Sequence, residues 1–512
     1  MAPSADAYGD SLSREPLALL NDPQVKLHHF NLLRTISGTQ TPGLDHFVNS
    51  PLFTLAALRQ LQGLSSHLTV SQYGLLAEIL ESEDSIRLTR ASKATSDFRL
   101  FYNTTVPSST FICGSQGSGK SHTLSCLLEN CLVASDAATL PRPLTALVFH
   151  YDTFVSDDAG SPCEAAYLAS MSGIRVRVLC SPTNWATITR TYQHLGVHVE
   201  ALQIDSRNLN TKRMLDLMAV NPEDGTVPLY IHVAYRVLRE MRMLQQQTGE
   251  RFNYELFKAK LLSSELTPAQ LGPLQQRLTV LESFMPSQRL KKEREKSSNQ
   301  TCGTDWKHEP GLLTIVDLSC PCVTPEAACS LFNTCLAIFL EQDSPCGRVI
   351  ALDEAHKYMT SSAESQALTS TLLSTVRLQR HVGARIVVAT QEPTVSSALL
   401  DLCSVTIIHR FTSPAWLRAL QAHVALPVQN QVTTRCRDRP SLDQALSNRE
   451  ELFGEIVGLK TGEAFIFAPS AAVSIGSKGD DCEQGSTLDR ACLKVRIRAR
   501  LSEDGGKSVV AR

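Results

Sequence analysis

Short, almost fully apolar runs recur along the chain from about residue 97 onward, and amphipathic stretches separate them. Each run is rich in apolar or β-branched residues and is bounded by turn residues or by a helix-like segment. Runs of this kind predict strands buried on both faces, and their alternation with helices predicts a mostly parallel sheet covered on both sides. The predicted strands are Thr110–Cys113, Thr145–His150, Ile174–Leu179, Val197–Ile204, Leu312–Leu318, Arg348–Leu352, Arg385–Ala389 and Val405–His409.

Other parts of the chain have a different pattern. Residues 1–96 predict loops and short helices, for example Leu52–Leu61 and Ser71–Leu80. The periodicity from Val227 to Phe284 is helical, and a charged stretch at 289–300 predicts a solvated loop. Gly476–Gly485 predicts another loop, and the chain ends in a polar tail. We therefore expect an N-terminal region (1–96), an α/β core in two halves (97–226 and 311–470), a helical insertion with the charged loop (227–310), and a C-terminal part (471–512) with a loop, a basic strand and the polar tail.

Composition excludes several classes of protein. The 512 residues suggest two or three domains, and the formal net charge of −2 argues against a protein that coats nucleic acid through bulk charge. No apolar run is long enough to span a bilayer, and the first residues lack a secretory signal. We expect an intracellular protein, in the cytoplasm or nucleus, with no membrane contact.

The cysteines change this picture little. Their number is odd, at 15, and several lie in apolar segments, which is typical of buried free thiols in a reducing compartment. The one compact cluster, Cys320 and Cys322 with Cys329 and Cys335, lacks the second Cys or His pair of a zinc site. The sequence therefore predicts no metal apart from one that accompanies a nucleotide.

The strongest chemical signal is a phosphate-binding loop. Residues Gly114, Ser115, Gln116, Gly117, Ser118, Gly119, Lys120 and Ser121 match G-x-x-x-x-G-K-[ST]. A predicted strand precedes the loop and a predicted helix follows it from His122, as such a loop requires. Backbone N–H groups at the helix N-terminus, His122 included, would surround phosphate oxygens. Lys120 would contact the β- and γ-phosphates, and Ser121 would bind Mg²⁺.

Two further strand ends carry polar side chains suited to the same site. Asp353 ends the apolar run Arg348–Leu352 and would hold Mg²⁺, while Glu354 would act as the general base that activates water. Gln391 follows the strand Arg385–Ala389 and would sense the γ-phosphate or orient water. The alternatives are a carboxylate pair that opens a helix and an ordinary transition from strand to turn.

The order of these motifs resembles the HerA/FtsK superfamily of P-loop ATPases. The resemblance covers residues Phe101–Val133 and Gly311–Phe467, and its most specific part is the helix ending in Arg377 and Arg380 followed by the strand into Gln391. It implies an α/β fold of RecA/HerA type, ATP and Mg²⁺ as cofactors, a homo-oligomer that forms a hexameric ring, and DNA as a partner. It also implies an arginine that completes the neighbouring subunit's site. Arg377 and Arg380 are the first candidates, Arg410 is the third, and surface ion pairing is the alternative for each.

One basic segment remains open to several interpretations. Leu493–Leu501 alternates between apolar residues and four cations, which predicts a strand. It is either an edge strand protected by charge or a strand that contacts a phosphate backbone or another subunit.

These observations lead to a Mg-dependent ATPase that works as an oligomeric HerA/FtsK-like motor on DNA or another polymer. The alternative is a nucleotide-dependent switch or scaffold whose helical insertion binds a protein partner. A small-molecule kinase is a third hypothesis. It lacks a separate acceptor-binding signature, and Glu354 beside the metal aspartate favours water as the acceptor.

Overall fold

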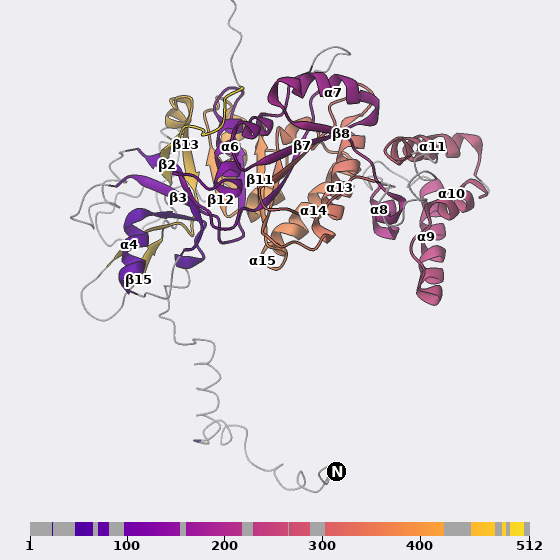
Figure 1. Cartoon of the computed structure of the whole chain (residues 1–512), viewed down its shortest axis with the longest axis horizontal. Coiled ribbons are helices and arrows are strands. Elements are labelled where there is room, and N and C mark those ends of the chain that lie inside the picture. The colour runs from indigo at the N-terminus through magenta and orange to yellow at the C-terminus, as the bar shows by residue number, and fades with distance from the viewer. Residues whose placement is uncertain are drawn as a thin grey trace, which may run out of the picture.

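The computed structural model describes residues 23, 47–64, 70–80, 97–153, 160–217, 229–264, 266–286, 303–423, 452–476, 484–487 and 492–505. Within these ranges the strands form one continuous sheet of sixteen, with helices packed against it (Figure 1). The predicted charged loop at 289–300, residues 477–483 of the predicted loop Gly476–Gly485 and the tail at 506–512 lie outside the described residues.

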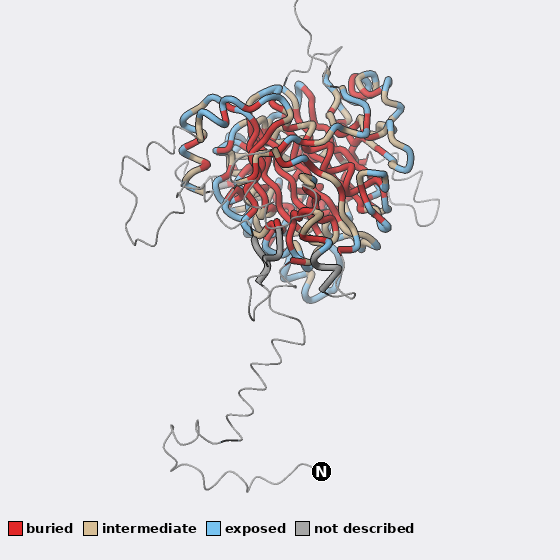
Figure 2. Tube along the Cα trace, turned by 90° about the vertical axis from the view of Figure 1, so that its left-hand side faces the viewer, coloured by how far each residue is buried: buried red, intermediate tan, exposed pale blue. Residues whose placement is uncertain are grey.

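One half of the sheet, which ends at the edge strand β8, is parallel and contains all eight predicted strands. In sheet order these are β12 (Val405–Ile408), β4 (Ser109–Cys113), β11 (Ala384–Thr390), β10 (Arg348–Leu352), β6 (Thr145–His150), β9 (Leu312–Asp317), β7 (Arg175–Cys180) and β8 (His198–Ala201). The middle strands are buried along their whole length, which accounts for their uniformly apolar sequences (Figure 2). The predicted fold class, a mostly parallel α/β sheet of the P-loop NTPase type, is confirmed.

Helices cover both faces of this parallel part. One apolar core lies under α6 (Lys120–Leu132) and α7 (Trp185–Tyr192) together with the 3₁₀ helix η1 (Glu164–Ser170). The other core lies under α13 (Pro325–Glu341), α14 (Ala363–Arg377), α16 (Ser397–Leu402) and α17 (Pro414–His423). Short helices complete the turns between these elements, namely η6 (Ala355–Lys357) and α15 (Gln379–Val382).

The helical insertion forms as predicted. It consists of α9 (Leu229–Thr248), α10 (Tyr254–Leu262) and α11 (Pro268–Ser283), which pack on one another and on α8 (Thr211–Leu217) at one end of the molecule (Figure 1). Arg277 of α11 forms an ion pair of 3.0 Å with Glu364 in the first turn of α14. Within the described ranges, none of the helices combines the length and apolar character needed to cross a bilayer.

A mostly antiparallel extension continues the sheet beyond β12 and joins N-terminal to C-terminal segments. In sheet order it contains β13 (Glu463–Phe467), β16 (Leu493–Ile497), β2 (Tyr73–Ile79), β3 (Arg99–Asn103), β1 (Leu52–Thr54), β14 (Ala472–Gly476) and β15 (Gln484–Thr487), with β5 (Ala138–Thr139) beside β2. A helix, α4 (Leu55–Leu64), packs near β14. The division of the chain at residues 96, 226, 310 and 470 stays a prediction.

The helix predicted at Ser71–Leu80 is wrong, because β2 occupies this segment. Its register with β3 shifts between Leu75 and Ala77, and this irregularity breaks the alternation that would have indicated a strand. Gly74 allows β2 to approach α6 closely, since a Cβ at Gly74 would lie 2.3 Å from Cγ of Asn130. The helix predicted at Leu52–Leu61 is correct only from Leu55 onward.

The strand predicted at Leu493–Leu501 is confirmed from Leu493 to Ile497, but it is not an edge strand. β16 pairs with β13 on one side and with β2 on the other. Its charges therefore do not protect a free edge. Of its cations, Arg498 and Arg500 are buried in ion pairs with Glu129 and Glu164, so these two guanidinium groups cannot contact a phosphate backbone.

Candidate nucleotide-binding site

The register of the parallel strands brings the predicted site residues to one edge of the sheet. Cys113, the last residue of β4, pairs with Thr390 at the end of β11, and Leu352 of β10 pairs with Val388. The phosphate-binding loop, Asp353 and Gln391 therefore all follow the carboxyl ends of neighbouring strands. This edge is where open parallel sheets bind ligands.

The conformation of the loop after β4 requires its glycines. Gly114, Gly117 and Gly119 have positive φ values of +155°, +70° and +115°, which side chains rarely adopt. A Cβ at Gly114 would lie 2.7 Å from Cβ of His409, whereas Gly117 borders open space. The loop thus packs tightly on one side and leaves room for a ligand on the other.

The N-terminus of α6 directly follows this loop. Its N-cap is Gly119, which has no side chain to cap the first N–H groups of the helix. Ser115 contributes differently, because its N–H already donates to the carbonyl of Arg410 at 2.9 Å. The donors suited to an anion are therefore those at the start of the helix, an arrangement that binds phosphate groups in other proteins.

Lys120 is almost fully buried within the loop. Its ammonium group donates to the carbonyl of Ser115 at 3.2 Å. Burial lowers the pKa of Lys120, and the carboxylates of Glu354 and Asp353 oppose this shift. The cation thus lies in the electrostatic field of both predicted acidic residues, where it can face a polyphosphate.

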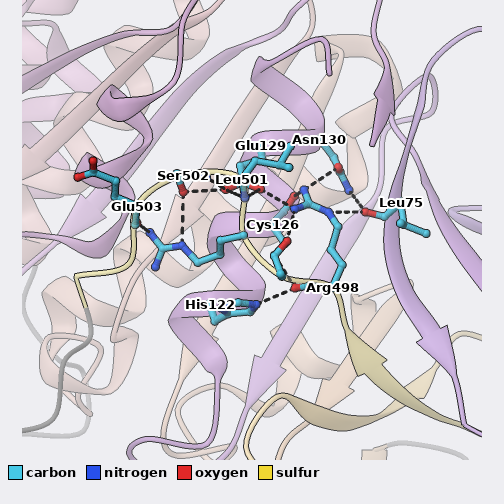
Figure 3. A network of polar contacts seen from close by, with 11 residues as sticks. Leu75, His122, Cys126, Glu129, Asn130, Arg498, Leu501, Ser502 and Glu503 are labelled. Atoms are coloured by element: carbon cyan, nitrogen blue, oxygen red, sulfur yellow. Dashed lines mark hydrogen bonds and ion pairs between the residues drawn. The ribbon is translucent and has the colours of Figure 1, made fainter. Parts of the chain in front are cut away.

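His122 does not direct its side chain to the phosphate cradle. Its Nε2 lies 2.8 Å from the carbonyl oxygen of Arg498, in the C-terminal segment (Figure 3). The predicted contribution of His122 to nucleotide binding is therefore limited to its backbone N–H, because the imidazole is engaged within the chain.

Asp353 is buried, and only one of its two carboxylate oxygens has hydrogen-bond partners among the described residues. Its Oδ2 atom lies 3.1 Å from Nδ1 of His150 and 3.7 Å from Sγ of Cys163. Burial raises its pKa, but the hydrogen bond and charge of His150 outweigh this effect and keep the pKa below its ordinary value. The second oxygen, Oδ1, is buried without a partner among the described residues. An ionised carboxylate with an open oxygen fits Mg²⁺, and Ser121, half-buried at the start of α6, is the second predicted ligand.

Glu354 and Gln391 contact each other directly. The side-chain amide of Gln391 donates to Oε2 of Glu354 at 3.0 Å. Glu354 itself is the one non-glycine residue with positive φ, at 48°, among the described residues. Such a conformation is strained by about 1–3 kcal/mol and is often found at functional sites.

The three candidate arginines do not lie together: two are at the amino edge of the parallel strands and one is at the carboxyl edge. Arg377 ends α14 and Arg380 lies in α15, just before β11 begins, so both are at the amino edge of the strands. Arg410 follows β12 at the carboxyl edge, beside the phosphate-binding loop. All three residues are exposed.

Two histidines that are not among the predicted site residues also lie at this site. His409 is fully buried, its Nδ1 donates to the carbonyl of Glu463 at 2.9 Å, and its Nε2 lies 2.8 Å from Oγ1 of Thr123 in α6. Burial lowers its pKa to about 4, so the ring is neutral and acts as a spacer under the loop. His356 places Nδ1 3.3 Å from Oε2 of Glu354. The available signal was a polar residue just at or after a predicted strand, the same signal that identified Gln391.

No protein-family model and no curated protein sequence matches the chain. Among solved structures, VirB4 of Thermoanaerobacter pseudethanolicus is 13% identical, covers 77% of this chain and 90% of its own, and has a TM-score of 0.38. The bacterial conjugative coupling protein TrwBΔN70 is 12% identical, with 84% and 94% covered and a TM-score of 0.44. The genome packaging NTPase B204 from Sulfolobus turreted icosahedral virus 2, in complex with ATP-γS, is 7% identical, with 70% and 91% covered and a TM-score of 0.25.

The resemblance of the sequence to the HerA/FtsK superfamily fits these neighbours. The order of the parallel strands and the site at their carboxyl edge are those of a P-loop fold. A glycine loop between a buried strand and a helix, with its lysine facing two carboxylates at the same edge, defines a P-loop NTPase.

Proposed function

We propose that this chain hydrolyses ATP in the presence of Mg²⁺. The observation that carries the proposal is the convergence of the phosphate-binding loop, Asp353, and the hydrogen-bonded pair of Glu354 and Gln391 at one edge of the sheet. When bound, Mg²⁺ would neutralise charge on the phosphate oxygens, and Ser121 and Asp353 are the residues that would hold it.

In this proposal each remaining residue has a defined role. Lys120 and the backbone of residues 114–121 bind the phosphates. Glu354 takes the proton of the attacking water. Gln391 holds the carboxylate of Glu354 in position and responds to the γ-phosphate. His356 supports the pair, because its Nδ1 lies 3.4 Å from the backbone N–H of Gln391 as well as close to Glu354.

We further propose that the active chain is a homo-oligomer, a hexameric ring by resemblance, with an arginine acting on the neighbouring subunit's ATP. Arg377, Arg380 and Arg410 each have an exposed guanidinium with no ion pair among the described residues. Arg377 and Arg380 lie across the sheet from the chain's own site, as a residue that serves a neighbour can. Arg410 lies beside the chain's own loop, so it is the candidate for an action within one chain or at an interface formed there.

A groove at the helical end of the molecule suits a polyanion. It has a volume of about 800 Å³ and lies between α8 and the end of α9. Its cations are Arg207, Lys212, Arg242 and Arg251, and its one acidic lining residue is Glu250. Arg207 is paired with Asp205, which leaves three cations whose ion pairs are not satisfied among the described residues. We propose that this groove contacts the phosphate backbone of DNA or another charged polymer.

The alternative function, a nucleotide-dependent switch with a protein partner, has its own supporting observation. The helical insertion exposes several large apolar side chains, namely Tyr235, Met243, Leu244, Leu256 and Leu262. Exposed apolar residues on one unit are typical of a surface that binds another protein.

The native mass of the full chain, with and without ATP, and its ATPase rate, with and without DNA, test the motor. The motor predicts an ATP-dependent oligomer and a rate that DNA stimulates. Reversing the charge of Lys212, Arg242 and Arg251 to Glu should remove the stimulation and leave the basal rate unchanged, whereas Arg142→Glu, an exposed control at another surface, should leave both unchanged. A monomer with slow turnover that DNA does not alter would overturn the motor and favour the switch.

A further inference from the structure

Three side chains that can bind a metal ion lie together at the carboxyl edge of the sheet. One of them is Asp353, which faces the other two with Oδ2 and not with its unpartnered Oδ1. His150 ends β6, Cys163 precedes η1, and Asp353 follows β10. One ligand atom from each, Nδ1, Sγ and Oδ2, lies within 4.8 Å of the other two. All three residues are at least nine-tenths buried. The cluster therefore brings distant parts of the sequence together in the core.

The spacing of these atoms is close to that of a zinc site. Tetrahedral Zn²⁺ with bonds of about 2.0–2.3 Å places its ligand atoms about 3.3–3.6 Å apart. Here Nδ1 of His150 is 3.1 Å from Oδ2 of Asp353, and Sγ of Cys163 is 3.7 Å from the same oxygen. Only small side-chain movements would be needed to place the three donors around a metal ion.

The donor set also selects the kind of metal. A thiolate and a carboxylate together balance the charge of a divalent cation, and a neutral imidazole adds none, so the buried site would be electrically neutral. Sulfur and imidazole nitrogen are ligands of Zn²⁺, whereas Mg²⁺ prefers oxygen ligands alone. The cluster shares Asp353 with the predicted magnesium site, but its other two donors are sulfur and imidazole nitrogen, whereas Ser121 and Asp353 offer Mg²⁺ only oxygen.

The surroundings hold the cluster in place and leave polar capacity unused. The backbone N–H of Cys163 donates to the hydroxyl of Tyr192 at 2.8 Å, and this hydroxyl donates to Asp317 at 2.7 Å. Nε2 of His150 is buried and lacks a hydrogen-bond partner among the described residues. Within the described part of the chain, the ring of His150 is thus held only through Nδ1, the nitrogen that faces Asp353.

We propose that His150, Cys163 and Asp353 bind Zn²⁺ or a similar thiophilic divalent cation, and that the positive charge of this ion at Oδ2 of Asp353 weakens Mg²⁺ binding at Oδ1 and slows ATP hydrolysis. The first part depends only on the cluster. The second part rests on the proposed ATPase function. The first part departs from the expectation from sequence that the chain binds no metal apart from the one that accompanies a nucleotide.

Metal binding is measured first, in the nucleotide-free full chain. Co²⁺ is the spectroscopic probe, because a cysteine ligand gives a sulfur-to-cobalt charge-transfer absorption, and Zn²⁺ affinity is measured by competition with a chromophoric chelator. We expect Cys163→Ser to lose this absorption and to weaken the tight Zn²⁺ site by on the order of a hundredfold or more. Cys126→Ser, a buried cysteine in α6, and Cys322→Ser, an exposed one, should leave both readouts unchanged.

His150→Gln provides a second route to the same result, with folding of every variant checked by circular dichroism. It should weaken the Zn²⁺ site while it keeps the cysteine absorption at high Co²⁺. If Cys163→Ser and His150→Gln both bind Zn²⁺ as tightly as the unchanged chain, or if the control cysteines account for the binding, the proposed site is wrong.

The inhibitory effect is measured separately, as the ATPase rate with and without one equivalent of Zn²⁺ at several Mg²⁺ concentrations. We expect Zn²⁺ to slow the unchanged chain by at least about tenfold and to have little effect on Cys163→Ser, each compared with its own metal-free rate. Tight binding without inhibition would overturn the link to Asp353. A chain without any ATPase activity would overturn the proposed function, while the cobalt and zinc titrations would still decide the site.

Discussion

The side-chain amide of Gln391 donates a hydrogen bond of 3.0 Å to the carboxylate of Glu354. The two residues follow neighbouring parallel strands, β11 and β10, whose register sets this contact. The bond joins the residue proposed to activate water to the residue proposed to respond to the γ-phosphate. It thus gives a direct physical route by which nucleotide binding can change the position of the base.

Removing this contact should slow hydrolysis and preserve ATP binding. We expect Gln391→Ala to reduce turnover by about tenfold to a hundredfold, part of the 10²–10⁴ that a positioned base contributes. ATP affinity should change little, because residues 114–121 supply most of the phosphate contacts and Gln391 responds only to the γ-phosphate. Steady-state phosphate release and calorimetric ATP binding measure the two quantities. Gln193→Ala, at an exposed glutamine elsewhere, is the control, and equal turnover in both variants would show that the contact has no catalytic role.

A mixing experiment determines whether an arginine acts between subunits. We expect one of Arg377→Ala, Arg380→Ala and Arg410→Ala to bind ATP normally and hydrolyse it poorly, since such arginines contribute on the order of 10³–10⁵ in rate in P-loop GTPases. Adding inactive Lys120→Ala protein should then restore some turnover, because it donates its intact arginine to a site whose Lys120 is intact. The other two arginine variants are matched controls. No rescue at any mixing ratio would mean that each site is complete within its own chain.

The C-terminal segment makes the stability of the nucleotide-binding helix depend on pH. Burial raises the pKa of Glu129, but hydrogen bonds from Ser502 and the charge of Arg498 outweigh it and hold the pKa below its ordinary value of 4.5 (Figure 3). A carboxylate whose pKa is lowered in the folded state stabilises the fold at pH values above its ordinary pKa. This contribution is lost as the pH falls through the folded-state pKa.

We therefore expect Glu129→Gln to lower the free energy of unfolding at pH 7 by about 3–5 kcal/mol, the usual cost of leaving a buried partner charge unpaired. The difference from the unchanged chain should shrink as the pH falls below 4.5. Urea unfolding at a series of pH values measures it. Glu78→Gln is the control, because Glu78 lies 3.9 Å from Arg496 in an exposed pair. A difference that does not vary with pH would refute the role of the Glu129 charge.

The parallel part of the fold could be predicted from sequence because its strands are buried on both faces. Burial on both sides requires continuous apolar runs, as in Thr145–His150 and Arg348–Leu352, and both strands have the predicted bounds. The antiparallel extension was harder to predict, since partial burial and a register shift in β2 remove the regular alternation. One partner of β16 is β2, whose paired residues lie more than 400 positions earlier in the chain, and no local pattern records such a pairing.

The candidate site likewise contains residues that the sequence predicts and contacts that it does not. Residues within one continuous motif, from Gly114 to Ser121, could be found from spacing alone, and Asp353 and Glu354 could be found because they follow a buried strand. The contacts of Asp353 with His150 and Cys163 could not, because three separate elements supply them. The engagement of His122 by Arg498 likewise depends on the path of a C-terminal segment that has no motif.

Comparing Glu354→Gln with the unchanged full chain tests the central claim most directly. ATP binding is measured by calorimetry and phosphate release by a steady-state assay, both in the presence of Mg²⁺. The account predicts that Glu354→Gln binds ATP normally but turns over at least about a hundredfold more slowly, because it keeps the shape of the side chain and loses the proton acceptor. Lys120→Ala, the control, should lose ATP binding. Unchanged turnover in Glu354→Gln would contradict the account, because Glu354 would then be a carboxylate at a turn rather than the base.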